Sequence, residues 1–368
     1  MRRAPRILLA GGGTGGHVYP AIAIAQAIRS IEPKSAIAFA GTRDHLEWNA
    51  VPDAGFEIHP ITISGFHRKQ LLRNVGLPFK LATGLWQSYQ LVQNFDADVV
   101  VGTGGYVSGP VLWAASLRGR PTVAQEQNAY AGITNRIVGH RAAQIHIAFE
   151  EAKSWFPEGR CRVSGNPVRE ELASSIQRSN ARTSLDVPQD AKVVFVFGGS
   201  LGSQAINEAM CQVSDQILSD PMVHVIWQTG RLYYERMKKH EQARLRILKY
   251  VDQMDLAYAA CDLVVARAGA LTCSELLCTA TPAILIPSPQ VAEDHQTKNA
   301  RSMARIGAAI CIPEEDLLNA LSIQVPALLA DQERRATMTS KARKAAKPQA
   351  AMTIANDILA LIGWEGYA

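Results

Sequence analysis

The chain has few cysteines, little excess charge and no long apolar run. Its six cysteines form no C-x-x-C pair and lie mostly in apolar surroundings, which is typical of reduced thiols in a cytosol. The formal net charge of +5 is too small for a dedicated nucleic-acid binder unless it is concentrated in one region. No stretch reaches the length of a membrane span, and the apolar run from Ile7 ends at Gly11 without a signal-peptide cleavage site. We expect a globular protein that stays inside the cell, with reduced thiols and no nucleic-acid partner.

Acidic residues are missing where two kinds of cofactor would need them. Gly11, Gly13 and Gly16 have the G-x-G-x-x-G spacing of a dinucleotide site, but such a site also needs a carboxylate about 20 residues later. That place holds Ala-Gly-Thr at 40–42, and Asp44 lies beyond the turn, so the nicotinamide interpretation is disfavoured. We also expect no D-x-D pair of carboxylates that would demand a metal ion. The sequence therefore predicts neither a cofactor nor a metal.

Short β-branched runs alternate with helical patterns in two series. Strands are expected at 6–10, 36–40, 57–61, 98–101, 122–124 and 144–148, and then at 192–197, 224–227, 248–251, 262–266, 283–287 and 308–312. This alternation is typical of parallel sheets covered by helices on both faces. The predicted class is α/β, with two Rossmann-like, doubly wound parallel-sheet domains that face each other across a cleft. A break in periodicity at "GNP" gives domains at 1–164 and 165–348, and the apolar spacing of 349–368 predicts a last helix packed back on the first domain.

Each predicted domain begins with a strand that runs into glycines. The first reads "RILLAGGGTGG" and the second "VVFVFGGSLGSQAINEA". A turn of this kind lets backbone N–H groups approach a ligand at a helix N-terminus, where the helix dipole favours an anion. Two such loops, one in each domain, predict two anionic ligands.

Seven motifs resemble one known family, and their order and spacing cover nearly the whole chain. They are "GGTGGH" (12–17), "GTGGYVSGP" (102–110), "EQN" (126–128), "GNPVR" (165–169), "FGGSLG" (197–202), "RAGALTCSE" (267–275) and "DHQTKNA" (294–300). On these motifs the chain resembles the MurG family, the bacterial N-acetylglucosaminyltransferases that act on undecaprenyl-diphospho-muramoylpentapeptide. The resemblance implies a GT-B type fold, with the lipid-linked acceptor (lipid I) on the first domain and UDP-N-acetylglucosamine on the second. It also implies peptidoglycan synthesis by a peripheral protein at the cytoplasmic face of the plasma membrane, with cell-wall synthesis and division complexes as partners.

The implied reaction gives lipid II by an inverting displacement, which needs a base for the attacking hydroxyl and stabilisation for the departing UDP. His17, at the tip of the first loop, is the candidate base, or it only donates a hydrogen bond to the acceptor diphosphate. Glu126 is the rival base, or it only orients its loop. By resemblance the acceptor diphosphate lies at Gly13, Thr14, His17, Gly104, Gly105 and Tyr106.

The donor diphosphate is expected where "ARAGALTCSELL" passes from a strand into a helix, because N–H groups there can face it without a metal. Glu275 would accept hydrogen bonds from the ribose, or it is only a carboxylate favoured by the helix dipole. Arg169 would frame the uracil, or it forms an interdomain salt bridge. By resemblance the donor site comprises Thr14, Gly15, Gly16, Asn128, Arg169, Ser200, Val251, Ala270, Leu271, Thr272, Glu275 and Gln296. Two positions depart from the family pattern: Leu201 stands where many relatives have Gln, and Gln125 where some have His.

Between Glu57 and Asp96 the chain has no acidic residue but mixes cations with apolar side chains. Such a surface is typical of proteins that bind an anionic membrane surface, although the same pattern fits an ordinary core helix with a solvated basic face. The expected membrane contacts are Arg68, Lys69, Arg73, Val75, Phe79, Lys80 and Trp86. Two other functions stay open at this point: a UDP-N-acetylglucosamine 2-epimerase, which shares the two-domain architecture, and a catalytically silent binder of a lipid diphosphate.

Overall fold

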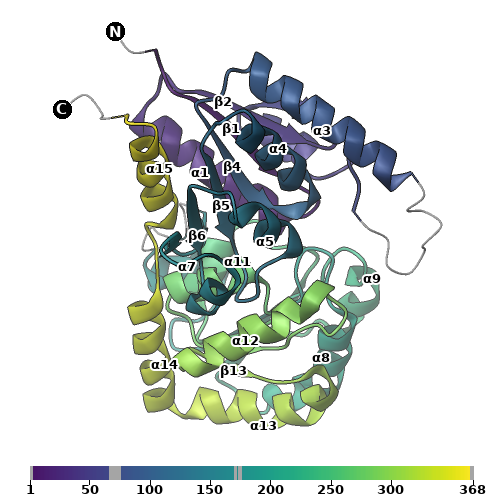
Figure 1. The fold of residues 1–368 in the computed structure, drawn as a ribbon. Helices are drawn as coiled ribbons and strands as arrows, with labels where there is room; N and C mark the ends of the chain where they lie inside the picture. Colours follow the sequence, from purple (N-terminus) through teal and green to yellow (C-terminus); the bar gives the residue numbers. More distant parts are fainter. Residues whose placement is uncertain (1–2, 66–75, 170–171, 173–175, 365–368) are drawn as a thin grey trace. The chain divides into compact units, whose positions relative to one another are not determined.

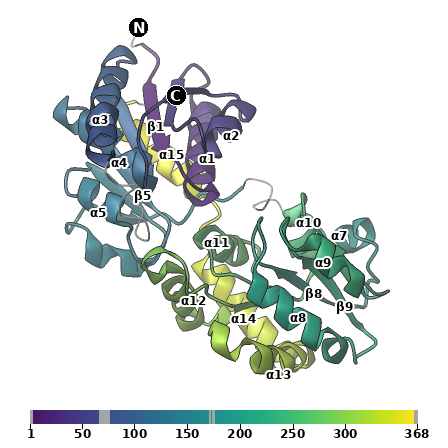
Figure 2. The same ribbon diagram turned by 90° about the vertical axis from the view of Figure 1, so that its right-hand side faces the viewer.

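The computed structural model describes residues 3–65, 76–169, 172 and 176–364, and the chain divides into two compact units. Unit 1 comprises Met1–Val168 and Pro348–Ala368, and unit 2 comprises Arg169–Lys347. Each unit is built on one parallel sheet with helices on both faces (Figures 1 and 2). The predicted class of two Rossmann-like, doubly wound α/β domains is confirmed.

Unit 1 has a sheet in the order β3-β2-β1-β4-β5-β6-β7. Its strands are β1 (Arg6–Gly11), β2 (Ala36–Gly41), β3 (Glu57–Pro60), β4 (Val99–Gly104), β5 (Thr122–Glu126), β6 (Gln144–Ile147) and β7 (Cys161–Val163). Its helices are α1 (Gly15–Ile31), α2 (Glu47–Asp53), α3 (Leu77–Asn94), α4 (Gly105–Leu117), α5 (Ile133–Gly139), the 3-10 helix η2 (Glu150–Trp155) and α15 (Ala350–Leu361). The sequence did not predict β7, because three half-buried or exposed edge residues are too few to show a period.

Alternate residues of β1 enter two separate cores. Ile7 and Leu9 are fully buried against α1 and α15, whereas Leu8 and Ala10 are fully buried against α3 and α4. This is the alternation expected of a strand covered on both faces. Ile358 of α15 belongs to the first of these cores, so the last helix of the chain packs on unit 1.

Unit 2 has a sheet in the order β10-β9-β8-β11-β12-β13. Its strands are β8 (Lys192–Phe197), β9 (Val223–Gln228), β10 (Leu245–Leu248), β11 (Leu263–Ala266), β12 (Ala283–Leu285) and β13 (Ala309–Cys311). Its α-helices are α7 (Arg178–Ser184), α8 (Gln204–Ile217), α9 (Tyr234–Met237), α10 (Met254–Ala260), α11 (Ala270–Cys278), α12 (His295–Ile306), α13 (Leu317–Ala330) and α14 (Gln332–Ala345). Its 3-10 turns are η3 (Lys238–His240), η4 (Ala292–Asp294) and η5 (Glu314–Asp316).

The strand predicted at 248–251 lies three residues earlier, at Leu245–Leu248. Leu245 and Ile247 are fully buried at a spacing of two, whereas the side chains of Lys249 and Tyr250 are exposed. The segment "LKYV" therefore contains the end of the strand and the turn that follows it, and burial of one face decides where the strand lies.

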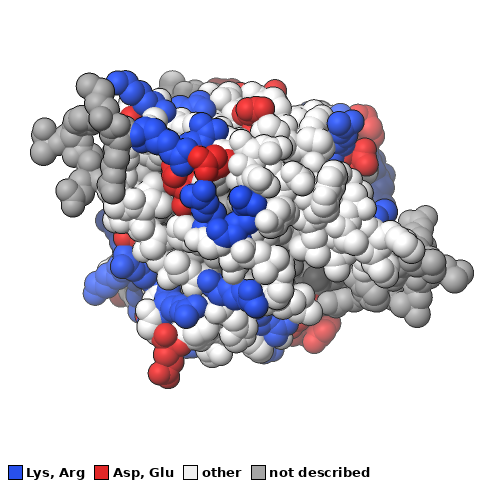
Figure 3. Space-filling model, turned by 45° about the horizontal axis from the view of Figure 1, so that its top comes forward, with Lys and Arg blue, Asp and Glu red and all other residues white. Residues whose placement is uncertain are grey.

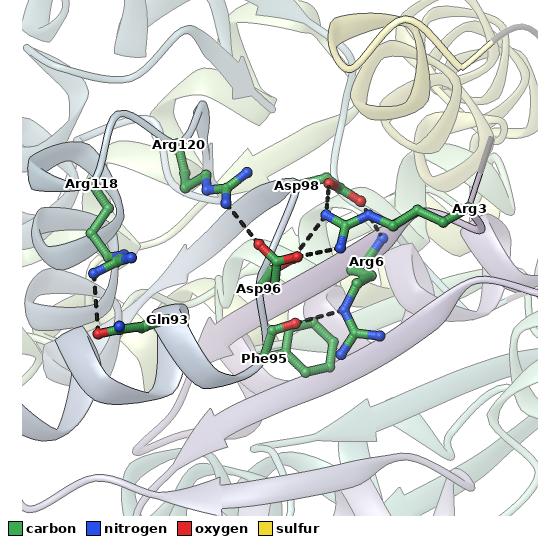
Figure 4. A network of polar contacts seen from close by, with 8 residues as sticks. All are labelled: Arg3, Arg6, Gln93, Phe95, Asp96, Asp98, Arg118 and Arg120. Atoms are coloured by element: carbon green, nitrogen blue, oxygen red, sulfur yellow. Dashed lines mark hydrogen bonds and ion pairs between the residues drawn. The ribbon is translucent and has the colours of Figure 1, made fainter.

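The chain does contain one D-x-D spacing, at Asp96 and Asp98, which corrects the expectation of none. Figure 4 shows both carboxylates at the amino end of β4, surrounded by arginines. Asp96 pairs with Arg3 and with Nη2 of Arg120 (2.7 Å), and the hydrogen bond from Arg3 lowers the pKa of Asp96. Asp98 accepts hydrogen bonds from Nη2 of Arg3 (2.7 Å) and from the backbone nitrogen of Arg6 (2.8 Å). This pair therefore ties the start of β1 to β4 and lies at the opposite end of the sheet from the glycine loops.

In both sheets the strand order reverses beside the first strand, between β1 and β4 in unit 1 and between β8 and β11 in unit 2. Ligands of doubly wound sheets bind outside the carboxyl ends of the strands at this reversal. Both glycine-rich loops follow these first strands directly, so each lies at the reversal of its own sheet.

Candidate functional site

Two glycine-rich turns meet at the reversal point of unit 1. One precedes α1, and the other joins the last residue of β4, Gly104, to the first residue of α4, Gly105, with φ angles of +100° and +75°. A Cβ at Gly105 would lie 2.3 Å from the carbonyl oxygen of Gly12, and one at Gly104 would lie 2.8 Å from Nδ1 of His17. Glycine is needed here for the left-handed backbone and for the close approach. The N-termini of α1 and α4 thereby meet, which suits an anionic ligand.

The first loop is held from behind by Glu47, a residue that the sequence analysis did not single out. Its buried carboxylate accepts hydrogen bonds from Gly13 N (3.1 Å), Thr42 N (3.2 Å) and Thr42 Oγ1 (2.6 Å). The ring of Tyr106 packs over Gly13, and its hydroxyl is 2.8 Å from Nε2 of His45. Burial raises the pKa of Tyr106, and so does the charge of Glu47. The residues predicted for the acceptor diphosphate thus lie together at the carboxyl ends of β1 and β4.

His17 lies in the first turn of α1, with its ring between the two loops. Its Nδ1 is 3.0 Å from the carbonyl oxygen of Thr103 and 3.0 Å from Oε1 of Gln127. Thr103 Oγ1 donates a further hydrogen bond to the backbone oxygen of His17 (2.7 Å). Nε2 of His17 has no hydrogen-bond partner among the described residues. One ring nitrogen therefore faces the protein, and the other is left for a ligand.

Glu126 is 1% exposed, and its carboxylate is fully occupied. Oε1 accepts hydrogen bonds from the backbone nitrogen (2.9 Å) and from Nδ2 (3.2 Å) of Asn128. Oε2 accepts from Gly132 N (3.0 Å) and from Nδ2 of Asn135 (2.9 Å). A carboxylate has about four lone-pair sites, so little capacity remains to take a proton from a substrate. These contacts favour the alternative in which Glu126 orients its loop.

Behind His17, three buried amide side chains form a hydrogen-bonded chain. Gln127 Nε2 donates to Oε1 of Gln125, and Gln125 Nε2 donates to Oδ1 of Asn166 (2.9 Å). Asn166 Nδ2 in turn donates to the backbone oxygen of Gln127 (3.0 Å). Gln125, one of the two departures from the family pattern, is therefore part of the surroundings of His17.

The glycine loop of unit 2 packs on the turn that follows β9. A Cβ at Gly202, which has a φ of +90°, would lie 2.1 Å from the carbonyl oxygen of Thr229. Ser200 is exposed on this loop, and so is Leu201, the second departure from the family pattern. The loop therefore turns Ser200 outward and holds Gly202 against the turn after β9.

Gln228, at the end of β9, links this loop to the turn after β10. Its side chain is buried, its Nε2 donates to the carbonyl oxygen of Gly199 (3.1 Å), and its Oε1 accepts from Val251 N (2.8 Å). The sequence analysis missed this residue, although a polar side chain that closes the buried run "VHVIWQ" was a usable signal.

Glu275 lies in the second turn of α11, and Ala270, Leu271 and Thr272 form the first turn. The hydroxyl of Tyr258 donates to Oε2 of Glu275 at 3.0 Å. Burial raises the pKa of Glu275, while the charge of Arg169 and the hydrogen bond from Tyr258 act to lower it. The N-terminus of α11 and this carboxylate therefore offer an anion site and a hydroxyl-binding group within one helix.

Two consecutive non-glycine residues, Glu293 and Asp294, have positive φ angles (+58° and +52°) immediately before α12. Such a backbone costs energy and is concentrated at binding sites. It sets the start of the helix, where Thr297 Oγ1 donates to Asp294 Oδ1 (2.6 Å) and Gln296 Oε1 accepts from Ser288 N (2.9 Å).

The predicted donor residues fall in both units. Unit 1 holds Thr14, Gly15, Gly16 and Asn128, and unit 2 holds Arg169, Ser200, Val251, Ala270, Leu271, Thr272, Glu275 and Gln296. Within unit 2, all of these except Arg169 follow the carboxyl ends of β8, β10, β11 or β12. Unit 2 thus gathers its part of the predicted set at one edge of its sheet.

The predicted membrane stretch is described only in part. Arg68, Lys69, Arg73 and Val75 lie outside the described residues. On α3, Phe79 is 77% and Trp86 63% exposed, and Nζ of Lys80 is 3.5 Å from Ser64 Oγ. In Figure 3 a broad area without charged side chains runs over α3 toward the grey residues, and lysine and arginine side chains gather beside it. Within the described residues, no helix is both long and apolar enough to cross a bilayer.

Comparisons with known proteins agree over the whole chain. Residues 7–147 match the glycosyltransferase family 28 N-terminal domain, and residues 193–354 match the glycosyltransferase family 28 C-terminal domain. A curated relative from Salinibacter ruber is 55% identical over 98% of this chain and 97% of its own length. Its name is UDP-N-acetylglucosamine--N-acetylmuramyl-(pentapeptide) pyrophosphoryl-undecaprenol N-acetylglucosamine transferase. A relative of the same name from Flavobacterium psychrophilum is 41% identical over 97% of this chain and 98% of its own length. The crystal structure of Acinetobacter baumannii MurG superposes with a TM-score of 0.79 and 29% identity, covering 97% of this chain and 99% of that one.

The chain belongs to the MurG family. The architecture is shared more widely than the family, since a putative UDP-N-acetylglucosamine 2-epimerase from Listeria monocytogenes superposes with a TM-score of 0.69 at 13% identity, covering 98% of this chain and 96% of that one. That likeness shows the fold alone, whereas MurG relatives match in sequence along the whole chain. Membership of the MurG family therefore favours a glycosyltransferase over the epimerase.

Proposed function

We propose that the protein transfers N-acetylglucosamine from UDP-N-acetylglucosamine to the 4-hydroxyl of the muramoyl sugar of lipid I, giving lipid II with inversion at the anomeric carbon. The proposal assigns acceptor binding to unit 1 and donor binding to unit 2. It is supported by curated relatives whose names state this transfer, the first of them 55% identical along nearly the whole chain. The structural observation that carries it is the placement of His17 where the N-termini of α1 and α4 meet, with Nε2 lacking a hydrogen-bond partner in the described part of the chain.

His17 supplies the base. The carbonyl oxygen of Thr103 can only accept a hydrogen bond, so Nδ1 of His17 carries a proton, and in the neutral ring Nε2 therefore keeps its lone pair. Nε2 takes the proton of the 4-hydroxyl as that oxygen attacks the anomeric carbon. Donation to the acceptor diphosphate, the other role considered for His17, would require a second proton on the ring.

The departing UDP is stabilised by backbone groups of unit 2. The bond between the anomeric carbon and the β-phosphate oxygen breaks while the new glycosidic bond forms, so negative charge grows on the diphosphate. The first turn of α11, from Ala270 to Thr272, and the loop with Ser200 turn N–H groups toward this charge. Glu275 holds the ribose, and its charge-assisted hydrogen bonds orient the nucleotide.

The apolar face of α3 docks the protein on an anionic membrane surface. Phe79 and Trp86 are exposed side chains that bury apolar area in the lipid boundary. Arg118 lies beside this face, 4.8 Å from the ring of Tyr89, and its guanidinium donates to Gln93 Oε1 (3.3 Å; Figure 4). No carboxylate among the described residues pairs with it. Its charge is therefore available to lipid headgroups. The attachment is peripheral, at the cytoplasmic face of the plasma membrane, and cell-wall synthesis and division complexes are the expected partners there.

The test is product analysis with a soluble, short-chain lipid I analogue. Incubation with UDP-N-acetylglucosamine and the analogue should give UDP and the β-linked disaccharide product, detected by mass spectrometry. Without the analogue, no sugar nucleotide should change. Formation of UDP-N-acetylmannosamine would instead identify an epimerase, and binding of both substrates without turnover would identify a silent binder.

A further inference from the structure

The geometry behind His17 points to a positioning role for Gln127: a relay of buried amides, running from Asn166 through Gln125 to Gln127, orients the imidazole and keeps its proton on Nδ1. Gln125, Gln127 and Asn166 are 0%, 1% and 2% exposed. The effect of the relay on turnover rests on the proposed function, whereas its effect on the ring of His17 can be measured without any substrate.

The direction of the relay is set by a backbone carbonyl. The carbonyl oxygen of Gln127 can only accept, so Asn166 turns Nδ2 toward it (3.0 Å) and leaves Oδ1 for Nε2 of Gln125 (2.9 Å). Oε1 of Gln125 then faces Nε2 of Gln127, which also lies 2.6 Å from the carbonyl oxygen of Thr103. Each amide therefore has one orientation that satisfies all its neighbours. The remaining acceptor, Oε1 of Gln127, is thereby turned toward Nδ1 of His17 at 3.0 Å.

The relay orients His17 without charging it. A carboxylate at the place of Gln127 would also accept from Nδ1, but its negative charge would favour the imidazolium form and fill Nε2 with a proton. A neutral amide fixes the ring through a hydrogen bond and adds no charge that would favour the imidazolium form. Gln127 is therefore matched to the task of Nε2 as a proton acceptor.

The middle position of the relay needs one donor and one acceptor. Gln125 meets this requirement with Nε2 and Oε1. A neutral histidine also has one donor and one acceptor nitrogen, so the histidine of some relatives could replace Gln125 without reversing the relay. Leucine at this position would break it.

The first measurement is the protonation of His17 by NMR of the full-length protein with 15N-labelled histidine, its signals assigned by their loss in His17→Ala. We expect the Nδ1–H tautomer in the wild type. Gln127→Glu should raise the pKa of His17 by about one unit or more, since an opposite charge in contact favours the charged form. The acid limb of the pH profile of kcat/KM should move to higher pH by the same amount, because that limb reports the pKa of the catalytic base in the free enzyme.

Gln127→Leu tests the hydrogen bond without a charge. We expect a smaller share of the Nδ1–H tautomer, which the carbonyl oxygen of Thr103 still favours, and a fall in kcat of about tenfold, less than the hundredfold or more that a positioned base contributes, while KM for UDP-N-acetylglucosamine is unchanged. Gln144→Leu is the matched control, because Gln144 lies in the same sheet and its buried Oε1 has no partner among the described residues. That variant should keep the tautomer, the pKa and the turnover of the wild type.

An unchanged pKa of His17 in Gln127→Glu, or a pure Nδ1–H tautomer with full turnover in Gln127→Leu, would overturn the relay. If neither variant folds, Gln125→His and Gln125→Leu decide. The first should keep the share of the Nδ1–H tautomer and the second should lower it, and equal behaviour contradicts the inference. If the imidazole of His17 responds to the Gln127 variants but His17→Ala keeps full turnover, the relay stands and the base role of His17 is removed.

Discussion

Tyr258 donates its hydroxyl hydrogen to Oε2 of Glu275 at 3.0 Å, from a ring that is itself held by Phe195 and Phe197 of β8. The ring centroids of Tyr258 and these phenylalanines are 5.9 and 6.2 Å apart, in edge-to-face geometry. The core of unit 2 thus supplies the hydrogen bond that opposes the effect of burial on the Glu275 carboxyl. A ribose-binding carboxylate needs to be ionised, so this contact links the core to nucleotide affinity.

Tyr258→Phe should make donor binding sensitive to acid. Burial raises the pKa of Glu275 and the tyrosine hydrogen bond lowers it, so its loss moves the pKa further up. The ionised Glu275 carboxylate contributes to UDP affinity above its pKa, and this contribution is lost as the pH falls through that pKa. The variant should therefore lose UDP affinity at a higher pH than the wild type. Isothermal titration with UDP across a pH series measures this. Glu275→Ala shows the affinity that remains without the carboxylate, with UDP binding weaker by about 2 kcal/mol at neutral pH. Identical pH profiles for the wild type and Tyr258→Phe would contradict the effect of Tyr258 on Glu275.

His17→Ala should lower turnover by at least about a hundredfold, the contribution expected of a positioned general base. UDP affinity should stay close to that of the wild type, because His17 belongs to unit 1 and the donor nucleotide is assigned to unit 2. Steady-state kinetics with the soluble acceptor and titration with UDP check the two parts separately. Retained turnover would end the base assignment, and a collapse of UDP affinity would end the assignment of substrates to units.

Gly105→Ala should cost both stability and activity. The residue has a φ of +75°, and a Cβ would lie 2.3 Å from the carbonyl oxygen of Gly12, so the first glycine loop would have to move. Gly119→Ala is the matched control, since Gly119 has a φ of +67° but no atom within 4 Å of its Cβ position. The control should lose about 1 to 2 kcal/mol from backbone strain and keep its turnover. Urea unfolding and kcat compare the two variants, and equal effects would mean that contact between the loops is unimportant.

The class of fold and the strand ends that carry the glycine-rich loops followed from the sequence because each depends on local patterns. β1 and β8 are continuous apolar runs closed by glycines, and such runs predict buried parallel strands whatever surrounds them. The partners of the site residues did not follow, since they come from distant segments. Glu47 reaches Gly13 from another helix, and Gln127 reaches His17 from another strand end, so no spacing in the sequence marks either pair. The position of β10 was wrong for a related reason, because burial by neighbouring elements decided which part of the run became the strand.

Unfolding should become easier in weak acid because of His146. Its side chain is fully buried on β6, hydrogen-bonded to Ser164 Oγ (2.6 Å), and burial lowers its pKa to about 4. The unfolded chain binds a proton at this histidine near pH 6.5, whereas the folded chain binds it only near pH 4. The contribution of His146 to folding stability is therefore fully present above pH 6.5 and is lost as the pH falls toward 4. The loss attributable to this group is about 3 kcal/mol. His146→Asn should show a flatter dependence of unfolding free energy on pH, whereas His140→Asn, at an exposed position, should keep the slope of the wild type.

Peripheral membrane attachment should depend on two exposed aromatic residues of α3. Phe79 is 77% and Trp86 63% exposed, and each can bury its ring among lipid headgroups and upper acyl chains. Attraction of cations to anionic lipid is screened within about 8 Å at physiological salt, so high salt should release part of the wild-type protein from vesicles. Replacement of both residues by Ser removes apolar area, which salt does not screen, and should weaken binding at every salt concentration.

The measurement is co-sedimentation with vesicles of phosphatidylglycerol and phosphatidylethanolamine, compared with turnover of the soluble acceptor. The double variant should pellet less than the wild type and keep almost full turnover, because α3 carries no residue assigned to either substrate. Leu318→Ser with Ile323→Ser is the matched control, since both residues are exposed apolar side chains on α13 of unit 2. A control that loses vesicle binding as strongly as the Phe79 and Trp86 variant would show that loss of any exposed apolar area has this effect. Equal pelleting of the wild type and the α3 variant would show that this face is not the docking surface.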